Sequence, residues 1–133
     1  MKVFVDTSAW LALNDKNDHY HARALEKSFE IKKDKIELVT TDYIIDESIT
    51  IIRYRVSHKS AVLFGDSLFN SSIVNVVNIS DEAKEAAWKL FRKYDDKELS
   101  YTDCTSFAVM NKLKIRKAFT FDEHFVQTGF EVF

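Results

Sequence analysis

Short apolar, β-branched runs alternate with amphipathic helical segments along this chain, and that alternation is the feature that most restricts its fold. A strand that is followed by a helix and then by another strand forms a right-handed crossover, which makes the two strands parallel. Repeated crossovers of this kind predict a mainly parallel sheet with helices on both faces. The sequence therefore predicts an α/β fold with three layers, α/β/α.

Five runs are expected to form strands and seven segments are expected to form helices. The expected strands are 2–5, 36–39, 73–77, 117–121 and 130–133, and the expected helices are 9–13, 18–31, 43–56, 57–69, 81–94, 104–113 and 123–128. The helix starts follow from capping signals, such as the capping-box pattern Ser100-Tyr101-Thr102-Asp103. The helix after that pattern is almost wholly apolar, which predicts burial on most of its sides.

The chain has 133 residues, of which 46% are hydrophobic and 30% are charged, and no linker or repeat divides it. We therefore expect one domain over residues 1–133. The single cysteine, Cys104, excludes an internal disulfide and is expected to fill the core. Because neither a signal-peptide pattern nor a membrane-length apolar run is visible, we expect a cytoplasmic protein. The net charge of −2 gives no general electrostatic reason to bind nucleic acid.

Three aspartates occupy positions where ligands bind in parallel sheets, at the carboxyl ends of strands or at the starts of neighbouring helices. Asp6 ends the first strand, Asp122 ends the fourth, and Asp103 opens the apolar helix that precedes the fourth strand. Taken singly, each of them is more simply explained as a helix cap or as an acid in a first helical turn.

Glu47 is a fourth acid, and it is harder to explain by capping. It shares a helix face with Ile44 and Ile51, and no basic residue lies three or four positions away. A carboxylate on an apolar stripe costs several kcal/mol unless something outside the helix compensates it. Either a bound metal ion supplies that compensation, or Glu47 reaches solvent at the edge of the stripe.

Four acids that converge from separate elements would suit a hard divalent cation. Mg²⁺ and Mn²⁺ prefer oxygen ligands, and a few carboxylates commonly hold them while they bridge to substrate phosphates. Such a cluster at the edge of a sheet indicates a metal-dependent phosphodiesterase of the nuclease type.

Four segments that contain these acids resemble, in the same order, the motif blocks of PIN-domain ribonucleases: VDTSAWLALN (5–14), TTDYIIDES (40–48), LSYTDCTSFAVM (99–110) and AFTFDEHF (118–125). The chain is similar to the small single-domain toxins of the VapC type in that family. The resemblance implies a PIN-like fold and a catalytic metal site formed by Asp6, Glu47, Asp103 and Asp122, with Mg²⁺ or Mn²⁺ as the cofactor. It also implies that the hydroxyls of Thr7 and Thr120 hydrogen-bond to these acids.

The same resemblance implies an endoribonuclease with an RNA substrate, a small antitoxin partner and a homodimeric state. The apolar helices of the first half are then the expected seat of dimerisation and antitoxin docking. Other functions stay open from the residues alone: a housekeeping RNA-processing nuclease, a metal-dependent phosphatase or phosphoacceptor domain, and a non-enzymatic partner-binding domain. Ser8 stands where a haloacid-dehalogenase-like phosphatase needs its second aspartate, so that alternative fits poorly.

Histidines and basic clusters complete the candidate residues. We interpret the histidines as surface residues, although one of them, two positions after Asp122, could instead touch the substrate; they are His19, His21, His58 and His124. Basic residues gather at Arg53, Arg55, His58 and Lys59, and again at Lys112, Lys114, Arg116 and Lys117. Phosphate contacts dominate nucleic-acid affinity, but the sequence does not indicate which cluster would make them.

Overall fold

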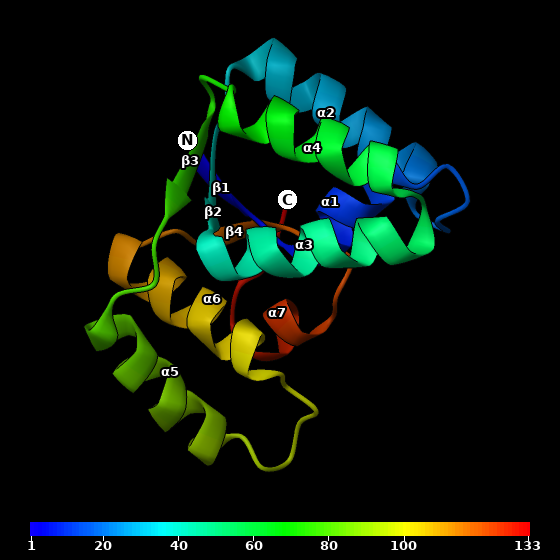
Figure 1. The fold of residues 1–133 in the computed structure, drawn as a ribbon. Helices are drawn as coiled ribbons and strands as arrows, with labels where there is room; N and C mark the ends of the chain where they lie inside the picture. Colours follow the sequence, from blue (N-terminus) through cyan, green and yellow to red (C-terminus); the bar gives the residue numbers. More distant parts are fainter.

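Five parallel strands form the centre of the computed structural model, which describes residues 1–133 (Figure 1). The strands are β1 (Lys2–Val5), β2 (Glu37–Thr41), β3 (Val74–Val77), β4 (Lys117–Phe119) and β5 (Glu131–Val132). Their order in the sheet is β3-β2-β1-β4-β5, and every neighbouring pair is parallel. The parallel sheet expected from the alternation of elements is therefore confirmed.

Seven helices cover the two faces of the sheet. They are α1 (Thr7–Asn14), α2 (His21–Asp34), α3 (Asp42–Arg55), α4 (His58–Phe69), α5 (Asp81–Lys93), α6 (Tyr101–Leu113) and α7 (His124–Gln127). Helices α1 to α4 lie on one side, and α5 to α7 lie on the other (Figure 1). This division follows from right-handed crossovers, because the chain moves from β1 to β3 in one direction and to β4 and β5 in the other. The three-layer α/β/α architecture is confirmed.

The core is densest around β1 and α6. Strand β1 has a partner on each side, and its residues Val3, Phe4 and Val5 are fully buried. The run from Cys104 to Met110 in α6 is also buried, as its apolar composition predicts. Burial raises the pKa of the Cys104 thiol to about 11, which keeps it protonated at neutral pH. Apolar burial on this scale holds both layers against the sheet.

After β3 the chain crosses to the other side of β1, so the switch point of the sheet lies between the neighbouring strands β1 and β4. Strands β2 and β3 lie on one side of β1, whereas β4 and β5 lie on the other. At such a switch point the loops after the two strands diverge and leave a crevice at the carboxyl edge, where ligands bind in open α/β sheets. Asp6 directly follows β1, and the loop from Thr120 to Asp122 directly follows β4.

Among the element boundaries that differ from the sequence-based prediction, two differ for the same reason. Strand β4 ends at Phe119 rather than at 121, because the backbone N–H of Phe121 donates to the Ser8 hydroxyl and that of Asp122 donates to the Thr120 hydroxyl. Helix α2 begins at His21 rather than at 18, because the Asp18 carboxylate accepts from the backbone N–H of Tyr20 in a turn. In both places a side chain replaces the backbone as hydrogen-bond partner.

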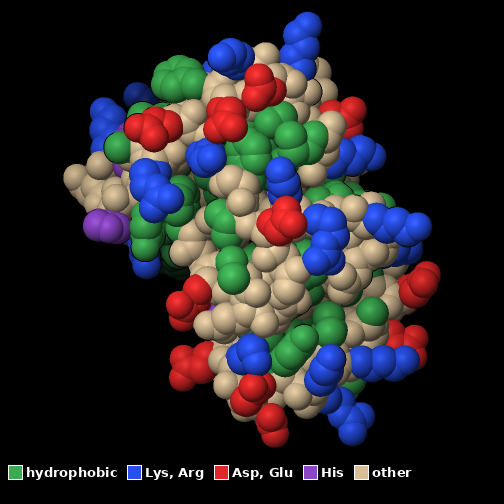
Figure 2. Space-filling model, turned by 180° about the vertical axis from the view of Figure 1, so that it is seen from behind, with side chains coloured by type: hydrophobic (Ala, Val, Ile, Leu, Met, Phe, Trp, Pro, Cys, Tyr) green, Lys and Arg blue, Asp and Glu red, His purple; other side chains and the backbone are tan.

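The surface mixes charges of both signs. On the face shown in Figure 2, Lys and Arg side chains are interspersed with Asp and Glu, and no broad basic area forms. None of the helices combines the length and the apolar character that crossing a membrane requires.

Candidate metal-dependent active site

The structure brings the four predicted acids around one hollow of about 320 Å³ at the carboxyl edge of the sheet. Each acid comes from a different element: Asp6 from the end of β1, Glu47 from α3, Asp103 from the first turn of α6, and Asp122 from the loop after β4. A fifth acid, Asp18, also lines this hollow, which we call the acidic pocket. Four unrelated helix caps would not meet in this way.

Asp6 is a buried carboxylate at the N-cap position of α1, but its side chain makes no capping hydrogen bond. Its Oδ2 instead accepts hydrogen bonds from the hydroxyls of Ser8 at 2.9 Å and Thr120 at 3.1 Å. The pKa of Asp6 is raised to about 6, mainly by burial and to a lesser extent by the nearby Asp103 carboxylate, while the two hydroxyls partly oppose the rise. The side chain is therefore held for a purpose other than capping.

Asp103 has two roles in the first turn of α6. Its Oδ2 accepts from the backbone N–H of Ser100 at 3.1 Å, and the Ser100 hydroxyl accepts from the Asp103 N–H at 2.9 Å. The predicted capping box is thus confirmed. Burial raises the pKa of Asp103, and the carboxylates of Asp122 and Glu47 raise it as well. Asp103 therefore both caps α6 and shares the like-charge repulsion of the pocket.

His124 is mostly buried beside two acids of the pocket, so the prediction that it is a surface residue is wrong. Its Nδ1 is 3.1 Å from Asp122 Oδ1 and 3.5 Å from Asp103 Oδ2. The same Asp122 oxygen accepts the backbone N–H of His124, which fixes the carboxylate at the start of α7. Although it is close to both acids, the buried Nδ1 has no hydrogen bond of acceptable geometry. Of the other histidines, His19 and His58 are exposed as predicted.

Glu47 is exposed, as expected for a carboxylate at the edge of the apolar stripe, and it also lines the acidic pocket, where a cation could bind it. It is nevertheless tied to the site, because the Thr7 hydroxyl donates to Glu47 Oε1 at 2.5 Å. Thr7 follows Asp6 directly in sequence. The bond therefore links the end of β1 to α3 and orients Glu47 toward the acidic pocket.

A network of hydroxyls holds the two loops at the switch point together. Thr120 donates to Asp6 and accepts from the backbone N–H of Asp122, and its Oγ1 is 3.2 Å from the Ser8 hydroxyl. Ser8 in turn accepts from the backbone N–H of Phe121. Sequence reasoning proposed Thr7 and Thr120 but missed Ser8. The available signal was its position two residues after Asp6, in the first turn of a helix at a strand end.

The donor atoms of this site suit a hard divalent cation. Ligand atoms of Asp103, Asp122 and His124 all lie within 4.8 Å of one another. Carboxylate oxygens dominate the set, as Mg²⁺ and Mn²⁺ require, and the buried His124 nitrogen lacks a partner within the protein. Burial raises the pKa values of Asp6 and Asp103, and repulsion between neighbouring carboxylates adds to the rise; a cation would offset both effects.

Comparison with known proteins gives a consistent result. The family described as "PIN domain" matches residues 3–131. The 23S rRNA-specific endonuclease VapC20 of Mycobacterium tuberculosis is 34% identical over 128 residues, which cover 96% of this chain and 95% of that protein. A VapC ribonuclease of Archaeoglobus fulgidus is 26% identical over 127 residues, which cover 94% of this chain and 80% of the relative.

Solved structures show the same likeness. The crystal structure of Mycobacterium tuberculosis VapC20, a sarcin–ricin loop cleaving toxin, superposes with a TM-score of 0.87 at 32% identity, and the match covers 96% of this chain and 95% of that one. VapBC2 from Rickettsia felis, bound to a DNA fragment from its promoter, gives 0.72 at 10% identity and covers 100% and 98%. At that identity the second comparison shows the fold alone.

Proposed function

Because this chain belongs to the PIN-domain family and is a nuclease of the VapC type, we propose that it hydrolyses phosphodiester bonds in RNA at the acidic pocket. In this proposal Asp6, Glu47, Asp103 and Asp122 are the catalytic residues and hold the metal ion, and residues 1–133 act as one domain. The observation that carries the proposal is the convergence of four acids, from four separate elements, on one hollow at the switch point of the sheet.

The carboxylates and hydroxyls of the acidic pocket would have different roles in this reaction. A bound Mg²⁺ or Mn²⁺ would supply charge neutralisation for the phosphate and a lower pKa for attacking water. The four carboxylates would hold the cation, and the hydroxyls of Thr7, Ser8 and Thr120 keep two of these carboxylates in place. Hydroxyl contacts of this kind orient metal ligands and typically change metal affinity or activity by about 10- to 100-fold.

Hydrolysis of this kind makes a specific product. Water adds its oxygen to phosphorus and the ribose 3′-oxygen leaves, so each cleavage yields a 5′-phosphate and a 3′-hydroxyl. Attack by the ribose 2′-hydroxyl would instead leave a cyclic phosphate on the 3′ side. We expect cleavage that requires Mg²⁺ or Mn²⁺, stops in excess chelator and returns when the metal is restored. End-labelled RNA, analysed for its terminal groups, measures both properties. Full activity in chelator, or 2′,3′-cyclic ends, would contradict the proposed chemistry.

We further propose that the substrate is a structured ribosomal RNA loop, like the one that the Mycobacterium tuberculosis relative cleaves. The support is an alignment that covers nearly all of both chains. A synthetic sarcin–ricin stem-loop, compared with a hairpin of the same stem and a scrambled loop, tests this point. Equal cleavage of the two hairpins would argue for a broad RNA-processing role instead. Since ribosomal RNA is cytoplasmic, the cytoplasm is the proposed location of this protein.

We propose that a small antitoxin controls this activity by docking on the first-half helices, which are also the proposed seat of a homodimer. A hollow of about 650 Å³ lies among α1, α2, α4 and the starts of β2 and β3, and ten of its seventeen lining residues are hydrophobic. Leu63 lines it and is 59% exposed. The indole N–H of Trp10, buried at the same hollow, has no acceptor. An apolar partner segment with one acceptor would complement this surface.

Replacing Leu63 by aspartate is expected to weaken antitoxin binding by at least about tenfold, because a charge would enter an apolar contact. RNA cleavage by the isolated protein should remain near wild type, since Leu63 does not line the acidic pocket. The matched control is Leu113→Asp, a similarly exposed leucine at the end of α6. Calorimetric titration with the antitoxin encoded beside the gene measures the difference. Equal affinity for both variants would remove the hollow from the docking surface.

A further inference from the structure

One cation lines the acidic pocket together with its five acids, and that cation is Arg55. It is the last residue of α3, and Glu47, Ile51 and Arg55 are spaced four apart, so they form one ridge of the helix along the pocket. Arg55 is exposed and forms no ion pair or hydrogen bond within the protein. An arginine beside five acids is thus left free to bind something else.

Because the acidic pocket is negatively charged, RNA binding there requires a cationic side chain that contacts phosphate. Five carboxylates and one guanidinium line it, so an RNA strand approaches a site whose protein charges mostly repel phosphate. A cation among the acids would offset repulsion at the reacting phosphate, but the neighbouring phosphates require contacts from the protein. The chain carries a net charge of −2, so its overall charge does not attract an RNA strand. Individual basic side chains at the rim must therefore make those contacts.

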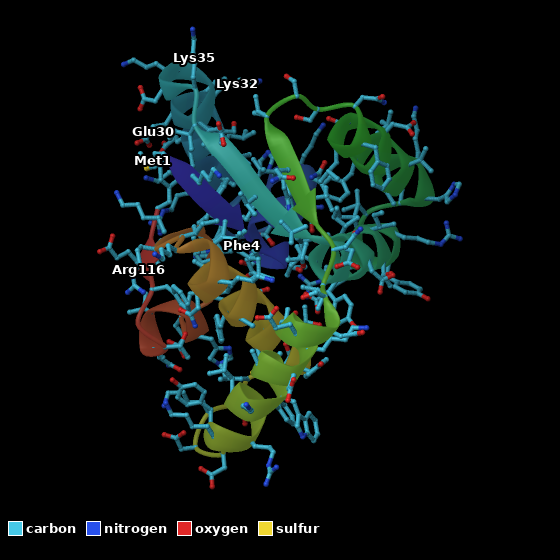
Figure 3. All side chains as sticks on the ribbon, turned by 90° about the vertical axis from the view of Figure 1, so that its left-hand side faces the viewer. Met1, Phe4, Glu30, Lys32, Lys35 and Arg116 are labelled. Atoms are coloured by element: carbon cyan, nitrogen blue, oxygen red, sulfur yellow. The ribbon has the colours of Figure 1, made fainter.

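The other basic cluster, residues 112–117, is placed too far away to do this. Helix α6 begins at the acidic pocket with Asp103 and runs back along the sheet, so Lys114 lies about 16 Å farther along its axis. Arg116 directly precedes β4, which runs parallel to β1, so it lies toward the end of the sheet where β1 begins, as does Met1 (Figure 3), whereas Asp6 follows the other end of β1. Arg116 is also occupied, because it donates to the Gly129 carbonyl at 2.6 Å and lies over the Phe130 ring.

We infer that Arg55 binds an RNA backbone phosphate adjacent to the scissile bond, which makes the C-terminal end of α3 the path of the substrate strand. This inference rests on the proposed ribonuclease function. A guanidinium suits the role because its planar fork can donate two parallel hydrogen bonds to one phosphate and keeps its charge at every working pH. A phosphate bound there carries no base information, so Arg55 positions RNA without selecting its sequence.

The test compares Arg55→Gln with Arg53→Gln. Both arginines are exposed in the last turn of α3, so each substitution removes the same charge from the same helix end, but Arg53 does not line the acidic pocket. The measured quantity is kcat/KM for the sarcin–ricin stem-loop with Mg²⁺, at several concentrations of monovalent salt. At 0.1 M salt we expect Arg55→Gln to lose about five- to eightfold in kcat/KM, the value of one phosphate contact. Arg53→Gln should stay within twofold of wild type.

The salt dependence separates a phosphate contact from a structural role. For Arg55→Gln the slope of log kcat/KM against log salt should be shallower by about 0.7 to 0.9, whereas a folding defect would leave it unchanged. Arg55→Lys keeps the charge but not the fork, so it should recover the slope and part of the rate. Equal rates and slopes for the two glutamine variants, with an active wild type, would overturn the inference. A wild type that cleaves no RNA would instead overturn the proposed function on which the inference rests.

Discussion

Asp103→Asn is expected to reduce RNA cleavage by at least about 100-fold while leaving the metal-free protein as stable as wild type or more stable. Metal ions contribute several kcal/mol to such reactions, and each 1.36 kcal/mol corresponds to a factor of ten in rate. The substitution removes one charge from the acidic pocket but keeps an oxygen that can accept from the Ser100 N–H. Burial and, to a smaller extent, carboxylate repulsion raise the pKa of Asp103, and removing the charge relieves both, which offsets the altered cap.

Melting curves with and without metal distinguish this role from that of a simple cap. Mg²⁺ or Mn²⁺ at 100 times its dissociation constant should stabilise wild type by about 2.7 kcal/mol, and Asp103→Asn by less. A helix-start acid that acts only through the macrodipole predicts the opposite pattern, a loss of about 0.3 to 1 kcal/mol with or without metal and nearly full activity. Asp81→Asn, in the exposed first turn of α5, is the matched control for that pattern. An Asp103→Asn protein that is less stable and fully active would end the assignment of Asp103 to the metal site.

Asp6→Asn is expected to stabilise the metal-free protein at neutral pH by up to about 3 kcal/mol while abolishing cleavage. The pKa of Asp6 is about 6 in the folded protein, against an ordinary value of 3.8. Between these two values the folded state binds more protons than the unfolded state, so the free energy of unfolding falls as the pH rises from about 4 to above 6. The difference between these two pKa values corresponds to roughly 3 kcal/mol. Asparagine is uncharged, so burying it carries no cost of ionisation. Its amide oxygen can still accept from the Ser8 and Thr120 hydroxyls.

Urea unfolding in chelator at several pH values between 4 and 7.5 measures this effect. The stability difference between Asp6→Asn and wild type should be small near pH 4 and should grow until the pH exceeds about 6. Asp46→Asn, an exposed acid on α3 outside the acidic pocket, should show no such growth. A constant difference across the range would mean that the buried Asp6 carboxylate does not carry the cost of ionisation. Both predictions share one premise, that the site is strained without a cation and relaxed with one.

The layered fold and the positions of the acids along the chain follow from local chemistry in the sequence. Strand and helix periodicity, together with N-cap side chains such as Thr41, Ser57, Ser80 and Ser100, determine where the elements begin. Alternating elements then leave right-handed crossovers and a parallel sheet as the simplest arrangement. Asp6 and Asp103 could be identified because each stands at an element boundary that local signals predict. Glu47 could be identified because a carboxylate interrupts an apolar helix stripe.

Only the tertiary structure decided what these residues do together. The pKa of Asp6 depends on its burial and on Asp103, which is 97 positions away in the chain, and no local pattern encodes that distance. His124 approaches Asp103 and Asp122 because α7 packs beside the start of α6, and Arg55 rather than residues 112–117 reaches the pocket because α3 and α6 present opposite ends to it. Strand β4 ends early because Ser8, more than 100 residues before it, takes a backbone N–H. Local propensities specify the elements, whereas burial, charge proximity and long-range hydrogen bonds arise only once those elements pack.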